Sequence, residues 1–282
     1  MQRKALYDIC GEILKNSGNE DWEFDTMCIF QDILHDKHPL FRPTEEVSGE
    51  DEKTIRQLTE RRSSGYPLQY LMGEWEFYGY PFRLSEDVLI PRPDTETLIE
   101  SVLEICRRQG MRSPKIADLC SGSGCIAITL KKELPLAEVS AVEISDGALD
   151  IIKENASLND ADIRIIKGDV LKKDTADMFR DMDIIVSNPP YVTAKEMAEL
   201  QQEVRYEPEM ALYGGEDGLD FYRTMTALWK NSLADGGWLL YEYGDGQQND
   251  VEKILNDNDF DNITLSRDLA GIFRTASAQK RR

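Results

Sequence analysis

The chain has 282 residues, of which 33 are Lys or Arg and 53 are Asp or Glu, so its formal net charge at pH 7 is −20. A hydrophobic content of 41% supplies the apolar side chains for a sizeable core, which excludes a disordered or fibrous chain. Because proteins that bind nucleic-acid phosphates usually carry a basic face, this charge also disfavours generic nucleic-acid binding.

Cysteine usage and the N-terminal sequence indicate a reducing compartment. The number of cysteines is odd and no pair has CxxC spacing, which argues against a disulfide framework and a zinc ribbon. Asp8 and Glu12 interrupt the apolar stretch that a signal peptide requires, and no uncharged run approaches the ~18 residues of a membrane span. We therefore expect a cytoplasmic protein that does not bind membranes. No long apolar face demands a partner, so we expect a monomer.

Residues 1–75 alternate apolar and charged side chains at helical spacing, with breaks at residues 16–18 and 39–43. Ser48 suits the N-cap of a following helix, although Asp51 stands where a full capping box has Glu or Gln. The pattern predicts a small N-terminal helical domain.

Residues 76–93 are rich in aromatic and β-forming residues and contain turn signals at residues 79–81 and 85–87. This segment predicts a β-hairpin linker between two domains. From residue 94 to residue 282, the pattern alternates between helix and strand, which predicts a parallel, doubly wound sheet with helices on both faces. Ligands of such sheets lie at the carboxyl ends of the strands, near the point where strand order reverses.

The second domain is predicted as an α/β fold with a doubly wound, mostly parallel, seven-stranded, Rossmann-like sheet. The predicted helices cover residues 94–110, 125–134, 145–159, 218–233 and 248–259. The predicted strands cover residues 115–120, 137–144, 163–169, 182–191, 237–244, 262–270 and 271–278.

A turn with the sequence Ser121-Gly122-Ser123-Gly124 connects the first of these strands to the next helix. Glycines let the backbone approach a ligand closely, and the helix N-terminus offers free amide N–H groups to an anionic or polar group. Glu143 ends the next strand, about 20 residues beyond the turn, where an acidic side chain can accept ribose hydroxyls. Taken singly, these features also fit a plain tight turn and a solvated carboxylate. Together they favour a nucleoside-containing cofactor, although the glycines also satisfy a GxGxxA dinucleotide pattern.

Asp169 and Val170 follow the third strand at the same edge of the sheet. The Asp169 side chain or the Val170 backbone is placed to receive the amino group of an adenine. An acidic cap on the following segment explains Asp169 equally well. The pair extends the candidate cofactor site without choosing the cofactor.

The most informative motif is Asn188-Pro189-Pro190-Tyr191, directly after the apolar segment at residues 182–187. Each proline removes a backbone donor and keeps its carbonyl, so the Asn188 amide oxygen and the Pro189 carbonyl can accept both hydrogens of a planar NH2 group. Tyr191 offers a flat face for stacking. Such bonding favours a pyramidal nitrogen, whose lone pair then points at an electrophilic methyl group. The motif predicts a substrate site for an amide or aromatic amine, with Asn188, Pro189 and Tyr191 as catalytic residues.

The second domain offers no evident side-chain base, because both histidines, His35 and His38, lie in the N-terminal segment. We interpret them as ordinary exposed polar residues and expect no metal site, since metal ligation needs further convergent ligands. The proton of a methylated amide cation is acidic enough to leave to water.

With these motifs, the chain resembles the class I S-adenosylmethionine-dependent methyltransferases that carry an Asn-Pro-Pro-Tyr motif. Among these it resembles the peptide chain release factor glutamine N(5)-methyltransferase family (PrmC/HemK). The resemblance covers nearly the whole chain beyond residue 60. It is carried by the segments GYPLQYLMGEWEFYGYPF (65–82), VLIPRPDTETLIE (88–100), DLCSGSGCIAI (118–128), IIVSNPPYV (184–192) and VRYEPEMALYGGEDGLDFYR (204–223). The specific part is IPRPDTE, because Asn-Pro-Pro-Tyr also occurs in enzymes that methylate adenine or guanine amino groups.

The resemblance implies S-adenosylmethionine as the cofactor of a methyltransferase sheet. Its methionine part is expected at the Ser121–Gly124 turn and the preceding Cys120, its ribose at Glu143, and its adenine at Asp169 and Val170. Asn188 borders cofactor and substrate, and with Pro189, Pro190 and Tyr191 it is expected to bind the substrate amide. Cys120 stands where many relatives have glycine, which puts the local shape of the turn in doubt.

By the same resemblance, the substrate is the glutamine in the Gly-Gly-Gln loop of class I peptide chain release factors, and the N-terminal domain helps to dock that protein. Arg92 and Glu96 are expected near the mouth of the active site, without an assigned chemical role.

Three alternatives stay open. An N6-adenine or related nucleic-acid methyltransferase could use the same Asn188–Tyr191 geometry on a flipped base, although charge weighs against it. An NAD-dependent oxidoreductase fits the glycine turn and Glu143 but leaves the Asn-Pro-Pro-Tyr motif unexplained. The third alternative is a non-catalytic cofactor-binding module, which would not need the Asn-Pro-Pro-Tyr motif.

Overall fold

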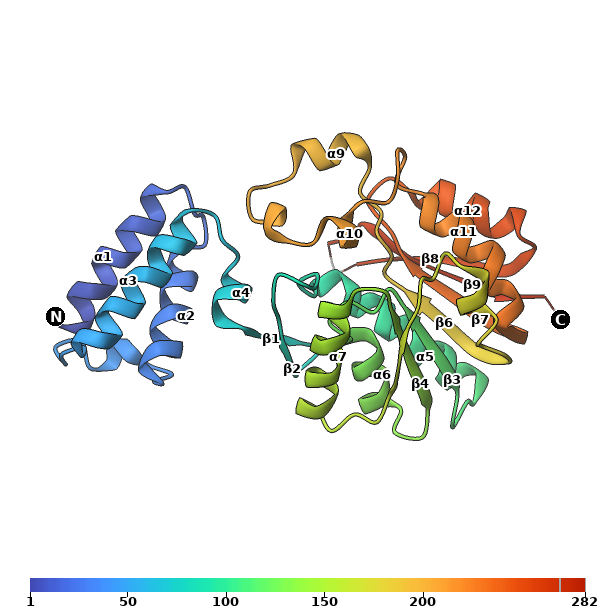
Figure 1. Cartoon of the computed structure of the whole chain (residues 1–282), viewed down its shortest axis with the longest axis horizontal. Coiled ribbons are helices and arrows are strands. Elements are labelled where there is room, and N and C mark those ends of the chain that lie inside the picture. The colour runs from blue at the N-terminus through green and yellow to red at the C-terminus, as the bar shows by residue number, and fades with distance from the viewer. Residues whose placement is uncertain (269, 282) are drawn as a thin grey trace. The chain divides into compact units, whose positions relative to one another are not determined.

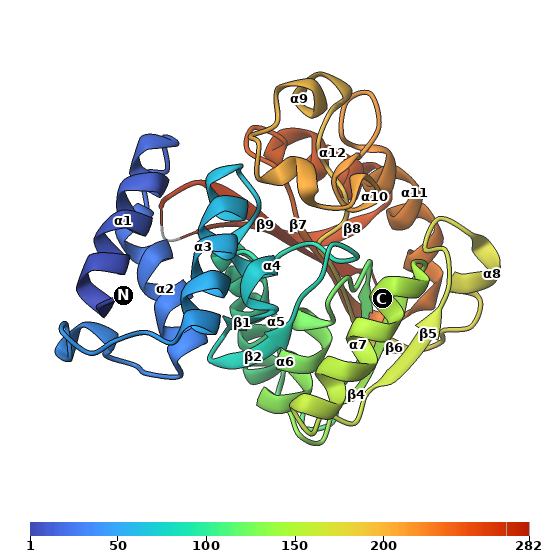
Figure 2. The ribbon, with the colours of Figure 1, turned by 60° about the vertical axis from the view of Figure 1, so that its left-hand side comes forward.

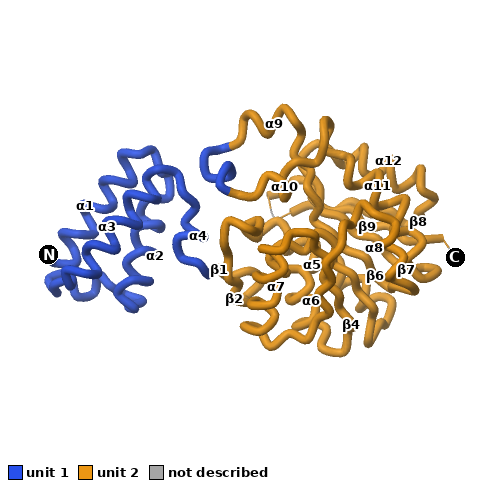
Figure 3. The backbone as a smooth tube through the Cα atoms, in the orientation of Figure 1, with its two compact units in different colours: residues 1–74, 201–206 blue, residues 75–200, 207–282 orange. Residues whose placement is uncertain are grey.

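The computed structural model describes residues 1–268 and 270–281. Its backbone forms two compact units (Figure 3): unit 1 holds residues 1–74 and 201–206, and unit 2 holds the other described residues from 75 to 200 and from 207 onward. The chain therefore leaves unit 2 after Leu200, contributes a short segment to unit 1 and returns at Glu207. Within the described residues, no helix combines the length and apolar character needed to cross a membrane.

Unit 1 is a bundle of helices, as its helical spacing predicts (Figure 1). Its helices are α1 (Arg3–Asn16), α2 (Trp22–Leu34), η1 (Pro39–Phe41), α3 (Gly49–Ser63), α4 (Leu68–Met72) and the separate turn η3 (Val204–Tyr206). The periodic apolar side chains meet in a core whose fully buried members include Leu6, Leu14, Ile29, Phe30 and Ile55. Burial of this apolar stripe is what stabilises helices that are short by themselves.

The predicted N-cap of α3 is confirmed. Ser48 accepts a hydrogen bond from the Asp51 backbone N–H at 3.1 Å, and its hydroxyl donates to the Asp51 carboxylate at 2.8 Å. Asp51 is too short to reach back to the Ser48 N–H as a glutamate would, so the cap satisfies one backbone donor.

A buried ion pair joins three segments of unit 1. Arg62, 7% exposed, donates from Nε to the buried Asp25 carboxylate at 2.6 Å, and from its Nη2 atom to Glu203 at 2.7 Å. Gln202 also donates to the Ser64 carbonyl at 2.6 Å. These bonds anchor residues 201–206, which lie more than a hundred residues away in sequence, to the end of α3.

Unit 2 is built on a seven-stranded sheet with the order β5-β4-β3-β6-β7-β9-β8, which confirms the predicted fold class. Its strands are β3 (Lys115–Leu119), β4 (Glu138–Glu143), β5 (Arg164–Lys167), β6 (Met182–Ser187), β7 (Leu233–Glu242), β8 (Phe260–Arg267) and β9 (Phe273–Lys280). The five strands β3 to β7 are parallel, whereas β9 pairs antiparallel with β7 and with β8. A separate hairpin is formed by β1 (Glu74–Phe77) and β2 (Tyr80–Arg83).

Helices cover both faces of this sheet (Figures 1 and 2), so its central strands are buried on both sides and read as nearly continuous apolar runs. One apolar cluster unites strand residues such as Ile116 and Ile184 with α5 (Glu96–Gln109), α6 (Cys125–Glu133) and α7 (Asp146–Leu158). The other unites Ala117 and Ile185 with α11 (Asp220–Trp229) and α12 (Gln248–Asp257). Neighbouring strand residues thus enter opposite cores, as the alternation of a strand requires.

The short helices α8 (Lys173–Ala176), α9 (Ala194–Glu199) and α10 (Glu209–Leu212) were not predicted. The turns η2 (Pro93–Thr95) and η4 (Lys230–Ser232) fall at the ends of the predicted helices 94–110 and 218–233. Two or fewer turns carry too little periodicity to be distinguished from loops in the sequence. Residues 208–211 and 213, at and beside α10, line the cavity described below.

Candidate active site

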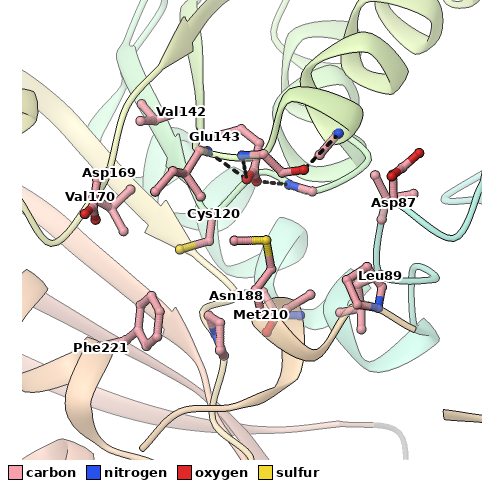
Figure 4. Close-up of a pocket in the computed structure, with 18 of the residues that line it drawn as sticks. Asp87, Leu89, Cys120, Val142, Glu143, Asp169, Val170, Asn188, Met210 and Phe221 are labelled. Carbon is pink, nitrogen blue, oxygen red and sulfur yellow. Dashed lines mark hydrogen bonds between the residues drawn. The ribbon is translucent and has the colours of Figure 1, made fainter. Parts of the chain in front are cut away.

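A cavity of about 550 Å³ opens at the carboxyl ends of β3, β4, β5 and β6 (Figure 4). The sheet register sets the position, because Leu119 of β3 is level with both Val142 of β4 and Ser187 of β6. The predicted site residues that line the cavity are Cys120, Gly122, Glu143, Asp169, Val170, Asn188 and Pro190. Ser121, Ser123, Gly124, Pro189 and Tyr191 are adjacent in the chain but are not among the lining residues.

The turn after β3 adopts left-handed backbone conformations at three positions. Their φ angles are 59° at Cys120, 53° at Gly122 and 80° at Gly124. Glycine takes these angles without strain, and a Cβ on Gly124 would lie 3.1 Å from the Ile128 side chain. Cys120 adopts the same kind of conformation with a side chain, at a steric cost of about 1–2 kcal/mol. The turn therefore keeps its shape at Cys120, but under strain.

The Cys120 thiol faces the cavity (Figure 4). Burial raises its pKa well above the ordinary thiol value, and the Glu143 carboxylate acts in the same direction. Because the thiolate is the reactive form, the thiol stays protonated and unreactive at neutral pH.

Glu143 organises the glycine turn (Figure 4). Its side chain is buried, and Oε2 accepts a hydrogen bond from the Gly122 N–H at 2.9 Å. Oε1 accepts from the N–H groups of Ile144 and Ser145 at 2.7 and 2.9 Å. A carboxylate offers about four acceptor sites, so these three bonds leave Oε2 able to accept once more on the cavity side.

Asp169 and Val170 sit after β5 and already make bonds of their own. Asp169 accepts from the Leu171 N–H at 2.9 Å in a local turn, and it does not cap the following helix α8, whose N-cap is Lys172. The Val170 carbonyl accepts from the Trp229 indole N–H at 2.8 Å. Each acceptor keeps a further lone pair, so both remain compatible with an amino group in the cavity.

The Asn188–Tyr191 motif follows β6 directly. Asn188 donates from Nδ2 to the Thr95 hydroxyl at 3.3 Å, while Pro189 and Pro190 are buried. Gln247 fixes the other end by donating to the Tyr191 carbonyl at 3.0 Å. Burial raises the pKa of the Tyr191 hydroxyl to about 12, so the phenol is neutral across the physiological range.

Glu207, which the sequence reasoning passed over, ties the segment after residue 206 to the IPRPDTE segment. Its buried carboxylate pairs with Arg92 and accepts from the Ile90 N–H at 3.0 Å. Glu96 instead accepts from the Tyr78 N–H at 3.1 Å, which fixes the β1–β2 hairpin. Neither Arg92 nor Glu96 lines the cavity.

Two fully buried carboxyl groups were also missed. Burial raises the pKa of Asp118 to about 8 and that of Glu242 to about 7. Asp118 accepts from the Ala127 N–H at 3.2 Å, but its other oxygen, like one oxygen of Glu242, has no hydrogen-bond partner among the described residues. The available signal was an acidic residue inside an otherwise apolar strand, because an unpaired buried carboxyl is costly and marks functional sites.

The strand order, the glycine turn after β3 and the carboxylate after β4 define a class I methyltransferase. A crystal structure of a methyltransferase from Pyrococcus furiosus has a similar fold, with a TM-score of 0.54 at 15% identity, over 73% of this chain and 91% of that one. The methyltransferase small domain family matches residues 94–212, and the PrmC N-terminal domain family matches residues 7–73.

Curated relatives specify the family. A release factor glutamine methyltransferase of Fusobacterium nucleatum subsp. nucleatum is 40% identical over 274 residues, which are 95% of this chain and 76% of that protein. One of Clostridium acetobutylicum is 36% identical over 272 residues, or 94% of each chain. The chain belongs to the release factor glutamine methyltransferase family.

Proposed function

We propose that this methyltransferase transfers a methyl group from S-adenosylmethionine to the side-chain amide nitrogen of the glutamine in the Gly-Gly-Gln motif of class I peptide chain release factors. The supporting observation is the position of Asn188, which lines the same cavity as Glu143. Its Nδ2 donates to Thr95, so Oδ1 is the end available to a substrate NH2 group. The names of the relatives support this substrate class.

The cavity fits S-adenosylmethionine in size and in donor set. Its volume of about 550 Å³ lies within the range of small-molecule sites. We assign the methionine part to Asp118 and the Cys120–Gly124 turn, because a buried Asp118 oxygen lacks a partner among the described residues. The spare acceptor capacity of Glu143 suits ribose hydroxyls, and Asp169 and Val170 suit an adenine amino group. When bound, the cofactor would supply an electrophilic methyl group on its sulfonium, and breakage of that C–S bond would release the neutral thioether, S-adenosylhomocysteine.

The chain's own residues then have to make an amide nitrogen nucleophilic. Its lone pair is delocalised into the carbonyl, so an unassisted amide reacts poorly. In our proposal Asn188 Oδ1 and the Pro189 carbonyl accept the two N–H hydrogens and hold the nitrogen in line with the methyl group. Tyr191 stacks on the amide plane. Because the methylated cation is strongly acidic, its proton leaves to water without a side-chain base.

We further propose that unit 1 docks the release factor. Residues 201–206 belong to unit 1, and the residues that follow them directly, Pro208 to Ala211 and Tyr213, line the cavity. Unit 1 also exposes large apolar side chains, with Phe24 56% and Phe41 81% exposed. Exposed aromatic groups of this kind are typical of protein-binding surfaces.

The test is methyl transfer from labelled S-adenosylmethionine. The enzyme is incubated with a class I release factor, with the same factor carrying alanine for the Gly-Gly-Gln glutamine, and with bulk DNA and RNA. We expect label in the first protein alone, on that glutamine. Label in both forms of the factor, or in nucleic acid alone, would overturn the proposal.

A further inference from the structure

Glu242 is a buried carboxyl that the proposed chemistry has not used. It is the last residue of β7 and is 2% exposed, and its Oε2 atom has no hydrogen-bond partner among the described residues. The other side chains of this strand end, such as Leu240 and Tyr241, are apolar or aromatic and fully buried. A carboxyl in such a place is costly unless its neighbours make use of it.

Those neighbours are Thr95 and Asn188. Asn188 Nδ2 donates to Thr95 Oγ1 at 3.3 Å, and both side chains lie near enough to the Glu242 carboxyl to lower its pKa. The three groups come from η2, β7 and the segment after β6, and Thr95 is itself 2% exposed. They form a buried network next to the cavity, which Asn188 lines (Figure 4) and Glu242 does not.

The network determines which end of the Asn188 amide enters the cavity. An ionised carboxylate can only accept hydrogen bonds, so it attracts the NH2 end of the amide and repels the oxygen end. The opposite orientation would turn Nδ2 toward the cavity, where it would meet the NH2 group of the substrate donor to donor. A buried unmade hydrogen bond of this kind is strongly unfavourable.

We propose that Glu242 is a positioning residue that holds the Asn188 amide with Nδ2 turned into the protein and Oδ1 turned toward the substrate. This inference rests on the proposed function, since it concerns the same amide site. Glu242 acts through Asn188 and touches neither substrate nor cofactor.

Charge around Glu242 makes this orientation sensitive to pH. Its pKa is raised to about 7, chiefly by burial and also by Asp94, against the lowering effects of Thr95, Arg274 and Asn188. The Arg274 charge is also paired with two other carboxylates, because its Nε lies 3.3 Å from Asp94 and 3.3 Å from Asp268. The other titratable groups that interact with Glu242 are Tyr191, Tyr222 and Cys125, all with raised pKa values and therefore neutral near pH 7. Above pH 7 Glu242 is the acceptor that orients Asn188, whereas below it the protonated carboxyl can donate to Oδ1 and favour the wrong orientation.

The first experiment needs no substrate. Protein labelled with ¹⁵N at asparagine is followed by NMR, and the Asn188 side-chain NH2 signals are assigned by their loss in Asn188→Ala. We expect these signals to titrate with a midpoint near pH 7 in the wild type and to lose the titration in Glu242→Gln. Signals that do not respond to pH in the folded wild type would overturn the inference.

The second experiment measures kinetics on the release factor. Loss of a residue that orients a metal ligand costs about 10–100-fold in activity, and by analogy we expect Glu242→Gln to lower kcat by roughly that factor. Its Kd for S-adenosylmethionine should not change. The wild-type kcat should rise with pH through about 7, and Glu242→Gln should lose that rise. An unchanged kcat and pH profile in Glu242→Gln would contradict the positioning role.

Two substitutions at Thr95 form a matched pair that tests the role of its hydroxyl. Thr95→Ser keeps the hydroxyl and should retain activity, whereas Thr95→Val keeps the shape and should lose activity in proportion to Glu242→Gln. Thermal unfolding of each variant identifies losses caused by misfolding. If the wild type does not methylate the release factor at all, the proposed function fails, and the NMR titration still decides whether Glu242 orients Asn188.

Discussion

Removal of the Glu143 carboxylate is the sharpest test of the cofactor site. In Glu143→Ala, the N–H groups of Gly122, Ile144 and Ser145 lose their acceptor, and the ribose loses the spare acceptor capacity of Oε2. A hydrogen bond to a charged group is worth about 1.5–3 kcal/mol. Loss of this one bond to the ribose therefore weakens binding by up to about 3 kcal/mol, which is roughly 10²-fold in Kd.

The assay is isothermal titration calorimetry with S-adenosylmethionine. Glu143→Gln should lose nearly as much affinity as Glu143→Ala, because its Nε2 would face backbone N–H groups as a second donor. Asp146→Asn is the matched control, since it removes one acidic charge nearby, where an exposed carboxylate pairs with Lys167 at 2.6 Å. We expect wild-type affinity in that variant. Wild-type affinity in a folded Glu143→Ala would refute the assignment of this residue to the ribose.

Three further predictions concern stability, turnover and thiol chemistry. Asp25→Ala removes one of the two carboxylate partners of the buried Arg62 and should destabilise unit 1 by about 1.5–3 kcal/mol in urea unfolding; a loss below 1 kcal/mol would contradict this. Gly214→Ala places a Cβ 2.7 Å from the Pro190 carbonyl oxygen, so turnover should fall more than cofactor affinity; equal losses in kinetic and binding assays would argue otherwise. At pH 8, iodoacetamide should modify Cys120 more slowly in the folded protein than in the unfolded chain, because burial raises the pKa of its thiol. Equal rates for the Cys120 peptide in mass spectrometry would contradict this.

The class of fold and the elements that carry the site could be predicted from the sequence. Periodicity is a local property, so the strands around Ile116 and Ile184 and the helices between them are visible without knowledge of their partners. Turn chemistry is local as well. The glycine turn requires left-handed backbone angles at Gly122 and Gly124, and the two prolines after Asn188 end β6 whatever surrounds them.

Local sequence patterns could not predict the ion pairs between residues that are far apart in sequence. The sequence does not indicate that Glu203 meets Arg62, which lies 141 residues away, or that Glu207 meets Arg92, which lies 115 residues away. The short helices α9 and α10 were missed because one or two turns show little periodicity. The start of α9 did carry a local signal, because Thr193 and Glu196 form a capping box there.

By itself, the sequence determined the chemical groups of this protein: an amide with two proline carbonyls after one strand, a carboxylate after another, and glycines between strand and helix. Only the tertiary structure decided how these groups are oriented. Asn188 and Glu242 converge because the parallel strands β6 and β7 bring their carboxyl ends to one edge, and Thr95 of η2 meets Asn188 across 93 residues of sequence. An amide presents a donor end and an acceptor end with equal ease, and the buried carboxyl behind Asn188 selects between them.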